Sequence, residues 1–330
     1  MDREQSTIIK GFAILFMFMY HMTNIEGIPQ VINALEKSIS CATHPISYFL
    51  IVSGYGLYCI YHQGRMTWCY LMRRSLRLYI VFWLVLLLFV GFVASVFYPG
   101  RFSLSLQTII TNFSGWRWDY CHFTWFLLPY ILISICSKWI FRIFDRISVL
   151  AALFGSMIVF LVASWIISRY FNSWLQWNYW AYHPVLVLQT LFPFIIGATA
   201  ARLTLNGCNF KLTRLVGKNV LIVFLIVATI LIRGQFHTSV FNPFMAAFIS
   251  WLILHLSFSS VPKHIFIELG HMSMYMWFIQ GFIAVEMFSE YFIQLRSPIL
   301  ILLVWVTVCF IISYPLSIAT KRITKYLKLA

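Results

Sequence analysis

The chain has 330 residues, of which 61% are hydrophobic and only 10% are charged, and its formal net charge is +15. A hydrophobic share this far above the roughly 45–50% of soluble domains excludes a soluble enzyme and predicts an all-α polytopic membrane protein, a single transmembrane domain over residues 1–330. Because no soluble basic domain with interleaved aromatic residues is available to read bases, the positive charge does not indicate a nucleic-acid partner.

Apolar runs recur along the whole chain, each long enough to cross a hydrocarbon core of about 30 Å. They predict ten transmembrane helices at residues 8–23, 45–62, 76–97, 124–141, 147–168, 184–201, 216–232, 240–258, 271–288 and 298–319.

The basic residues predict the orientation, because cytoplasmic loops near span ends collect Lys and Arg. With the N-terminus inside, the outer side holds only Lys37, Arg101, Arg117, Arg169, Arg233 and Arg296 of the 24 Lys and Arg residues. The inner side holds the other 18, including Lys211, Arg214 and Lys218 in one loop. Both termini are therefore predicted to be cytoplasmic, and the net charge reflects topology.

The first predicted span, "IIKGFAILFMFMYHMTN", carries Lys10 and His21 at the two ends of its apolar run. Eleven residues advance an α-helix by about 16 Å and roughly three turns, so both side chains lie on one stripe at different depths. One explanation is that Lys10 snorkels to the inner headgroups and His21 sits in the outer interface. The other is that both line a cavity in the bundle, as ionisable groups within membranes commonly do.

The next two spans add further candidates. In "FLIVSGYGLYCIY", the small residues Ser53 and Gly54 permit close helix approach, and they would also leave room for a thin substrate chain. In "WCYLMRRSLRLYIVFW", Arg73, Arg74 and Arg77 either anchor the inner edge of the third span or bind a phosphorylated cytoplasmic ligand. Arg74 and Arg77, three residues apart, share a helix face and suit phosphate.

Two outer loops are rich in aromatic residues, "NFSGWRWDYCHFTWF" at 112–126 and "FNSWLQWNYWAYHP" at 171–184. Both fit interfacial aromatic belts, and both also fit platforms for sugar rings. The histidines, including His122, His183, His264 and His271, lack metal-ligand spacing, so no metal is predicted.

Five stretches in chain order, "KGFAILFMFMYH", "YFLIVSGYGLY", "RRSLRLY", "FTWFLLPYIL" and "LGHMSMYMWFIQ", resemble the acyltransferase family 3 membrane proteins. Members of that family commonly O-acetylate cell-surface glycans. The resemblance covers the chain from Lys10 to about Gln280.

The resemblance implies roles for individual residues. The family's basic residue and histidine of the first helix match Lys10 and His21, and its Arg-x-x-Arg pair matches Arg74 and Arg77. Its small-residue, aromatic and ninth-helix motifs match a set that would line the substrate channel, Ser53, Gly54, Tyr55, Trp125, Ser273 and Tyr275. The chain departs from the family pattern at Thr7, Ile80 and Gln280, where many relatives carry an acid, a proline and a histidine.

Through the resemblance we expect an O-acetyltransferase that moves an acetyl group from cytoplasmic acetyl-CoA to a hydroxyl of a surface or polyprenyl-linked polysaccharide. Arg73, Arg74, Arg77 and Lys10 would bind the donor phosphates, and His21 would act as a general base or carry the acyl group, with Lys10 on the same stripe. The group that stabilises the oxyanion stays open. The resemblance also implies a bacterial inner-membrane location, contact with membrane lipid, and partners among the polysaccharide-assembly proteins of the envelope.

A different class of function stays open, a transporter or flippase of a lipid-linked sugar or an organic anion that carries out no chemistry. Such proteins typically contain internal repeats and paired broken helices, and the sequence offers neither.

Overall fold

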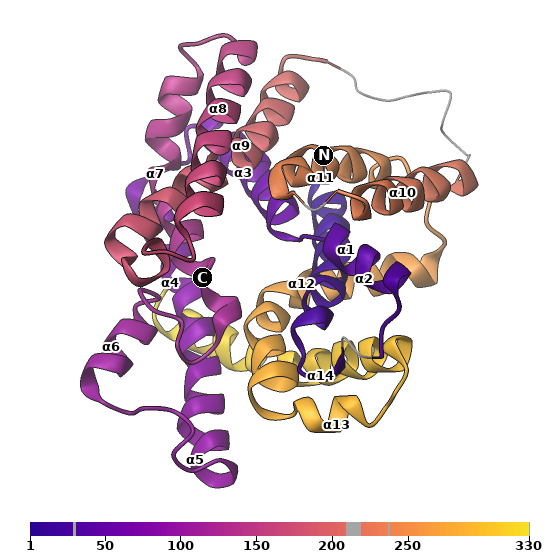
Figure 1. Cartoon of the computed structure of the whole chain (residues 1–330). Helices are drawn as coiled ribbons and strands as arrows, with labels where there is room; N and C mark the ends of the chain where they lie inside the picture. The colour runs from indigo at the N-terminus through magenta and orange to yellow at the C-terminus, as the bar shows by residue number, and fades with distance from the viewer. Residues whose placement is uncertain (29–30, 209–218, 237, 330) are drawn as a thin grey trace. The chain divides into compact units, whose positions relative to one another are not determined.

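The structure is a computed structural model, and it describes residues 1–28, 31–208, 219–236 and 238–329. Helices and their connecting turns make up this described part, and it contains no β-strand (Figure 1). The all-α class predicted from the sequence is thereby confirmed. The basic residues Lys211, Arg214 and Lys218 and the start of the span predicted at 216–232 lie outside the described residues.

Six helical segments of the described part are long and apolar enough to cross a membrane, by length and composition. They are Arg3–Asn24, Trp68–Phe97, His122–Phe144, Val149–Tyr170, Tyr179–Leu205 and Pro298–Tyr326. The multi-pass architecture is therefore confirmed, while the count of ten spans and the cytoplasmic termini stay predictions.

The other four predicted spans also fall on helices, which are shorter or more polar than expected. The helices α3 (Ile46–His62), α10 (Asn219–Gly234) and α11 (Asn242–Ile253) have 17, 16 and 12 residues. The span predicted at 271–288 belongs to α12 (Ser260–Gly281), which begins eleven residues earlier than expected, and to the π-helix that continues it from Phe282 to Met287. Its first turns carry Lys263, His264 and Glu268, so apolar-run length could not locate its start.

The chain divides into two compact units, each assembled from three segments. Unit 1 comprises Met1–Tyr20, Asn33–Met66 and Cys136–His271, and unit 2 comprises His21–Ile32, Thr67–Ile135 and Met272–Ala330. The helices α1 (Arg3–His21), α7 (Leu127–Phe144) and α12 contribute residues to both.

Unit 1 is built on helices that approach each other through glycines. Besides parts of the shared helices and α3, α10 and α11, it contains α2 (Ala34–Ala42), α8 (Val149–Tyr170) and α9 (Tyr179–Leu205). A Cβ added at Gly54 of α3 would lie 2.0 Å from the Phe194 carbonyl oxygen, and one added at Gly197 of α9 would lie 2.0 Å from the Ile51 oxygen. Only glycine fits at such contacts, where backbones pack directly against each other.

Close contacts at glycines also join α1 to the first half of α12 within unit 1. A Cβ at Gly270 would lie 2.0 Å from the Thr7 carbonyl oxygen, and one at Gly11 would lie 2.2 Å from the Phe266 oxygen. The rings of Phe12 and Phe266 stack beside this contact with centroids 3.9 Å apart. A buried cluster that includes Ile9, Ile51 and Ile249 forms the core around these helices.

The outer surface of α8 suits a hydrocarbon environment. Leu150, Phe154 and Ile158 recur at every fourth position, and each is more than half exposed. Exposure of a row of large apolar side chains to water is unfavourable, so this row supports the assignment of α8 to the membrane.

Unit 2 contains two π-helical segments in addition to its α-helices. Its further helices are α4 (Trp68–Leu86), α5 (Ala94–Phe97), α6 (Leu106–Phe113), α13 (Ser289–Ile293) and α14 (Pro298–Tyr326). The π-helix η3 (Leu87–Val93) follows α4, and the π-helix η7 (Phe282–Met287) follows α12. Phe89 of η3 stacks on Phe282 of η7 at 5.0 Å, so the two π-helices pack together. π-Helical segments are rare in proteins, and those that occur are often found at functional sites.

Candidate active site in unit 2

His21 is the last residue of α1, and its side chain belongs to the interior of unit 2. The residue is 7% exposed, and the helix gives way to the short 3-10 helix η1 (Met22–Asn24) directly after it. The imidazole stacks on the ring of Phe123, with centroids 4.0 Å apart and planes at 22°. Glu26, the nearest acid in sequence, is exposed to solvent.

Phe123 is itself held in place from α12. It lies in the 3-10 helix η4 (His122–Thr124), and its carbonyl oxygen accepts a hydrogen bond of 3.1 Å from the Trp277 indole nitrogen. A Cβ at Gly281 would lie 2.4 Å from Cδ2 of Phe123, so the ring packs directly against the α12 backbone. These contacts fix the surface on which the imidazole rests.

The three arginines of α4 are placed differently, although all three belong to unit 2. Arg74 is half-buried and donates a hydrogen bond of 2.6 Å to the Tyr130 hydroxyl, whereas Arg73 and Arg77 are exposed. The Nε atom of Arg74 is buried and has no hydrogen-bond partner among the described residues. Arg74 therefore keeps a buried donor that an anionic group can use.

A row of aromatic side chains runs from Arg74 to His21. Tyr130 contacts Phe126 with ring centroids 5.6 Å apart, and Phe126 contacts Trp277 at the same distance. Trp277 binds Phe123, which stacks on His21. We call the four residues Tyr130, Phe126, Trp277 and Phe123 the aromatic wall. It connects a guanidinium to an imidazole within one compact unit.

Three other predicted site residues also belong to unit 2. Trp125 is half-buried with its ring centroid 5.9 Å from that of Phe126. Ser273 and Tyr275 are buried on α12, at 4% and 7% exposure. Ser273 lies four residues before Trp277, a spacing that places both on one face of the helix.

Gln280, on the same helix, is fully buried, and neither atom of its side-chain amide has a hydrogen-bond partner in the described part of the chain. An unsatisfied buried polar group costs about 1–3 kcal/mol. The Gln280 amide therefore keeps unused hydrogen-bonding capacity inside unit 2.

The remaining predicted site residues belong to unit 1. Lys10 is half-buried on α1, and Ser53 is buried on α3. The Tyr55 hydroxyl accepts a hydrogen bond of 2.8 Å from the amino group of Met1. Gly54 packs against α9 as described above, so the structure favours the close-approach explanation there and leaves no space for a substrate chain on that side. At Gly56, two residues on, an added Cβ would meet no atom within 4 Å.

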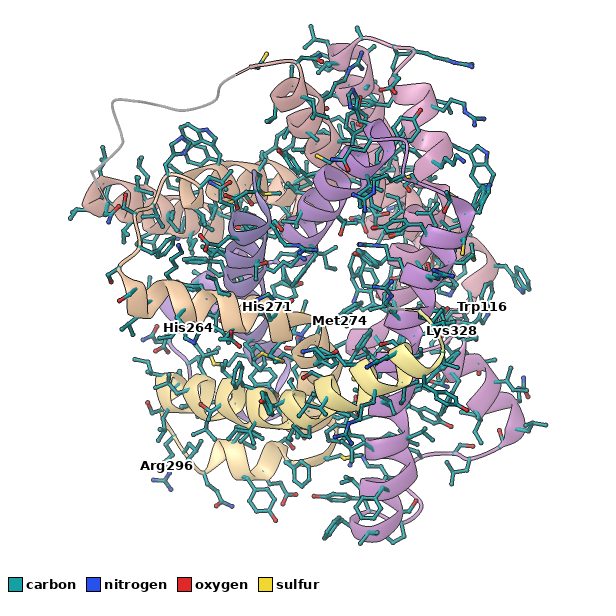
Figure 2. All side chains as sticks on the ribbon, turned by 180° about the vertical axis from the view of Figure 1, so that it is seen from behind. Trp116, His264, His271, Met274, Arg296 and Lys328 are labelled. Carbon is teal, nitrogen blue, oxygen red and sulfur yellow. The ribbon has the colours of Figure 1, made fainter. Side chains whose placement is uncertain are left out.

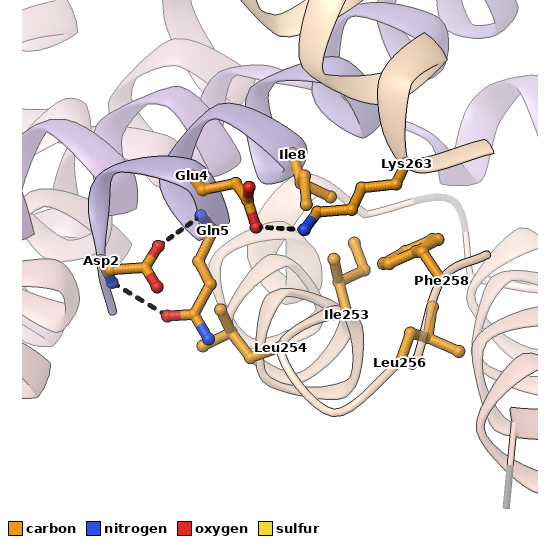
Figure 3. Close-up of a pocket in the computed structure, with 9 residues that line it drawn as sticks. All are labelled: Asp2, Glu4, Gln5, Ile8, Ile253, Leu254, Leu256, Phe258 and Lys263. Atoms are coloured by element: carbon orange, nitrogen blue, oxygen red, sulfur yellow. Dashed lines mark hydrogen bonds and ion pairs between the residues drawn. The ribbon is translucent and has the colours of Figure 1, made fainter. Parts of the chain in front are cut away.

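A pocket of about 190 Å³ opens in unit 1 near the start of α1 (Figure 3). It is lined by Asp2, Glu4, Gln5, Ile8, Ile253, Leu254, Leu256, Phe258 and Lys263. Glu4 and Lys263 form an ion pair of 2.8 Å at its rim. None of the predicted site residues lines this pocket, so we do not assign the reaction to it.

The other histidines give no metal centre in the described part of the chain, where no group of three or more His, Cys, Asp or Glu side chains could hold an ion. His264 and His271 are exposed on α12 about two turns apart (Figure 2), and His183 is buried in unit 1.

Sequence reasoning missed Phe123, Tyr130 and Trp277 as site residues. All three occur inside stretches that carry the family resemblance, "FTWFLLPYIL" and "LGHMSMYMWFIQ". An aromatic residue in a membrane helix is common, however, so only the contacts between these rings single them out.

The comparisons with known proteins identify the family. The family model described as an acyltransferase domain matches residues 4–322, which is nearly the whole chain. The search of curated proteins and the search of solved structures found no match. With a family match over this length, and with the helices and the wall between Arg74 and His21 in place, the chain belongs to the acyltransferase 3 family of membrane proteins.

Proposed function

We propose that this membrane acyltransferase transfers an acetyl group from cytoplasmic acetyl-CoA to a hydroxyl of a cell-surface or lipid-linked polysaccharide. The observation that carries the proposal is the aromatic wall, which connects Arg74, a half-buried cation, to His21, a buried imidazole, within unit 2. A cation for phosphate and an imidazole for acyl chemistry are the two groups that a coenzyme A thioester requires.

On the donor side, Arg74 binds a phosphate of coenzyme A. The hydrogen bond to Tyr130 holds the Arg74 guanidinium in place, and the buried Nε–H has no hydrogen-bond partner among the described residues. A guanidinium is well matched to phosphate oxygens. The exposed Arg73 and Arg77 add positive charge on the same helix. Lys10 belongs to unit 1 and keeps the donor-binding role that the family resemblance implies. The pantetheine arm then follows the aromatic wall, whose rings provide apolar contact along its length.

At the far end of the wall, His21 acts on the acceptor hydroxyl. As a general base, a nitrogen of its ring takes the hydroxyl proton while the oxygen attacks the thioester carbonyl. The carbon–sulfur bond breaks, and the thiolate of coenzyme A receives the proton from the imidazolium. As a nucleophile, the imidazole would carry the acetyl group between the two steps. Trapping of an acetylated His21 would distinguish these two routes.

The acceptor reaches this site from the outer side of a bacterial inner membrane, as a glycan or a polyprenyl-linked saccharide. Membrane lipid surrounds the protein, and envelope polysaccharide-assembly proteins are its proposed partners. Trp125, Ser273 and Tyr275 of unit 2 are the proposed lining of the substrate path. Ser53 and Tyr55 of unit 1 keep the channel role that the family resemblance implies.

The test uses purified protein in lipid nanodiscs with radiolabelled acetyl-CoA and an envelope glycan extract. We expect wild type to bind acetyl-CoA and to transfer label to the glycan. Arg74→Ala should weaken donor binding about tenfold or more, because a hydrogen bond to a charged group contributes about 1.5–3 kcal/mol. Arg146→Ala is the matched control, since Arg146 is an exposed arginine outside the candidate site.

Two results would contradict the proposal. If well-folded wild type binds no acetyl-CoA, the transporter alternative replaces it. If Arg74→Ala and Arg146→Ala reduce binding equally, the arginine supplies only general positive charge.

A further inference from the structure

A cluster of three charged side chains forms in unit 2 outside the aromatic wall. The Glu286 carboxylate lies between His122 and Arg101, with 3.7 Å from Oε1 to the His122 Nδ1 atom and 3.7 Å from Oε2 to an Arg101 nitrogen. The Glu286 side chain is 14% exposed, whereas those of Arg101 and His122 are 41% and 75% exposed. A largely enclosed carboxylate therefore faces two accessible basic groups, and we call these three residues the Glu286 cluster.

The spacing within the Glu286 cluster leaves hydrogen-bonding capacity unused. Elsewhere in the protein, the ion pair between Lys263 and Glu4 closes to 2.8 Å and the pair between Arg117 and Asp119 closes to 3.0 Å. At 3.7 Å the two contacts of Glu286 exceed the length of a charge-assisted hydrogen bond, which is about 2.7–2.9 Å. A carboxylate has about four acceptor positions, so Glu286 can still accept bonds from hydroxyl groups.

The backbone at Glu286 is π-helical, a rare conformation that is often found at functional sites. Glu286 belongs to the π-helix η7, which begins directly after α12 and packs on the second π-helix η3. A π-helical turn changes the direction of the following side chains relative to a regular helix. In this segment it places a single acid opposite two basic residues that are far away in sequence.

The Glu286 cluster is joined to the candidate active site by adjacent residues. His122 faces Glu286, and the next residue, Phe123, stacks on His21. Gly281, which precedes η7, contacts both Phe123 and Cys121. Two adjacent residues of the short helix η4 therefore connect the Glu286 cluster with the His21 imidazole.

The loop that supplies His122 differs from the other aromatic loop. In the 171–184 loop, Trp177 and Trp180 are 76% and 80% exposed, as expected of an interfacial belt. In the 112–126 loop, Trp116 and Trp118 are half-buried, and Asp119 is fixed by hydrogen bonds from Asn112 and Arg117. Figure 2 marks Trp116 on this loop. Ordered polar groups beside aromatic faces favour the sugar-platform explanation for this loop.

We propose that the Glu286 cluster binds hydroxyl groups of the saccharide acceptor. The inference rests on the proposed function, because it assigns the acceptor side of the same reaction. The Glu286 carboxylate accepts hydrogen bonds from two neighbouring hydroxyls, while Arg101 and His122 donate to sugar oxygens and hold the carboxylate in place.

The test is saturation-transfer NMR on the protein in nanodiscs free of sugar-headgroup detergent, with the methyl glycosides of glucose and galactose as probes. Wild type should transfer saturation to at least one glycoside. Its permethylated form should give no signal, because it has no hydroxyl to donate to a carboxylate. Glu286→Gln should weaken binding about tenfold or more, as expected for loss of hydrogen bonds to a charged group.

Two further variants sharpen the test. His122→Asn should also weaken glycoside binding, and it alters an exposed side chain. Glu290→Gln makes the same acid-to-amide change at an exposed position of α13 and should leave binding at the wild-type level.

Acetyl-CoA binding measured on the same samples separates the two proposals. If Glu286→Gln weakens glycoside binding and leaves acetyl-CoA binding intact, the acceptor site is supported. If the variant weakens both equally, or if the permethylated glycoside binds as well as the free one, the assignment is overturned. If wild type binds glycoside without binding acetyl-CoA, the saccharide site stands and the proposed donor fails.

Discussion

The two units of this protein use different means to hold their helices together. Unit 1 relies on glycines: Gly54 and Gly197 join α3 to α9, and Gly11 and Gly270 join α1 to α12. Unit 2 relies on rings and charges, with the aromatic wall, two π-helices and the Glu286 cluster. Backbone contact through glycine leaves no room for a ligand at the contact itself, whereas unit 2 contains buried polar atoms with unused hydrogen-bonding capacity.

The comparison suggests a division of labour. Unit 1 is the more regular scaffold, and unit 2 holds the imidazole, the half-buried arginine and the enclosed carboxylate. Changes at the glycine contacts of unit 1 should therefore act mainly on stability, and changes at these three side chains of unit 2 should act mainly on binding and turnover.

The largest expected effect is the loss of turnover in His21→Ala. General-base catalysis typically contributes 10²- to 10⁴-fold, so acetyl transfer should fall by at least about 100-fold while acetyl-CoA binding persists. The measurement is transfer of radiolabel under saturating donor. His264→Ala, an exposed histidine outside the site, is the control, and wild-type transfer by His21→Ala would refute the role of His21.

The next effect is a loss of stability in unit 1. Gly54→Ala places a methyl group where the Phe194 carbonyl oxygen is 2.0 Å away, so α3 and α9 must separate. Overpacking of this kind costs about 1–3 kcal/mol. Gly56→Ala, where a Cβ meets no atom within 4 Å, should instead stabilise the helix by up to about 1 kcal/mol. Unfolding midpoints in nanodiscs compare the pair, and equal midpoints would contradict the helix-contact role of Gly54.

A smaller effect is expected at the donor end of the aromatic wall. Tyr130→Phe removes the hydroxyl that binds Arg74, so acetyl-CoA affinity should fall about threefold to tenfold, the range of a single hydrogen bond. Tyr79→Phe removes a comparable hydroxyl bond, to the Ser114 carbonyl oxygen, outside the wall. If both variants bind acetyl-CoA with wild-type affinity, Tyr130 does not position Arg74 for the donor.

A further effect is a dependence of the stability of unit 1 on pH. Burial and the charge of Arg233 lower the pKa of His44, in the turn before α3, from 6.5 to about 4. Between these values the unfolded chain binds a proton that the folded chain does not, so stability should be complete above pH 6.5 and decline as the pH falls toward 4. The unfolding midpoint should therefore be lower at about pH 5 than at about pH 7.

His44→Gln has no imidazole to protonate, and it should reduce the difference in midpoint between the two pH values. An unchanged difference would show that another group is responsible.

Much of the fold followed from local pattern. In the described part of the chain each predicted span falls on a helix, and six helical segments are long and apolar enough to cross a membrane, because a membrane helix needs a continuous apolar stretch that can be read without its neighbours. The π-helices at Leu87–Val93 and Phe282–Met287 could not be predicted, since their residues are as apolar as those of a regular helix. The start of α12 was also misplaced, because charged residues occupy its first turns.

Part of the candidate site could be predicted as well. His21 stands out because ionisable residues are rare in membrane spans, and Arg74 belongs to a cluster of three arginines at the inner edge of the third predicted span. The spacing of Arg74 and Arg77 suggested that they act together, but the structure distinguishes them, since only Arg74 meets a tyrosine hydroxyl. Glu286 lies inside the span predicted at 271–288 and carries the same signal, but its pairing could not be predicted, because Arg101 and His122 lie more than 160 residues earlier in the chain.

The sequence by itself determined that the chain lies in a membrane, that it is helical, and that ionisable residues stand at the two ends of the first apolar run. Composition and periodicity are properties of single segments, so they can be read without the tertiary structure. Only the tertiary structure decided which of these residues meet. The contact of His21 with Phe123, the hydrogen bond of Arg74 with Tyr130, and the position of Glu286 beside His122 each join distant segments. Such contacts depend on how helices pack, and no local pattern specifies them.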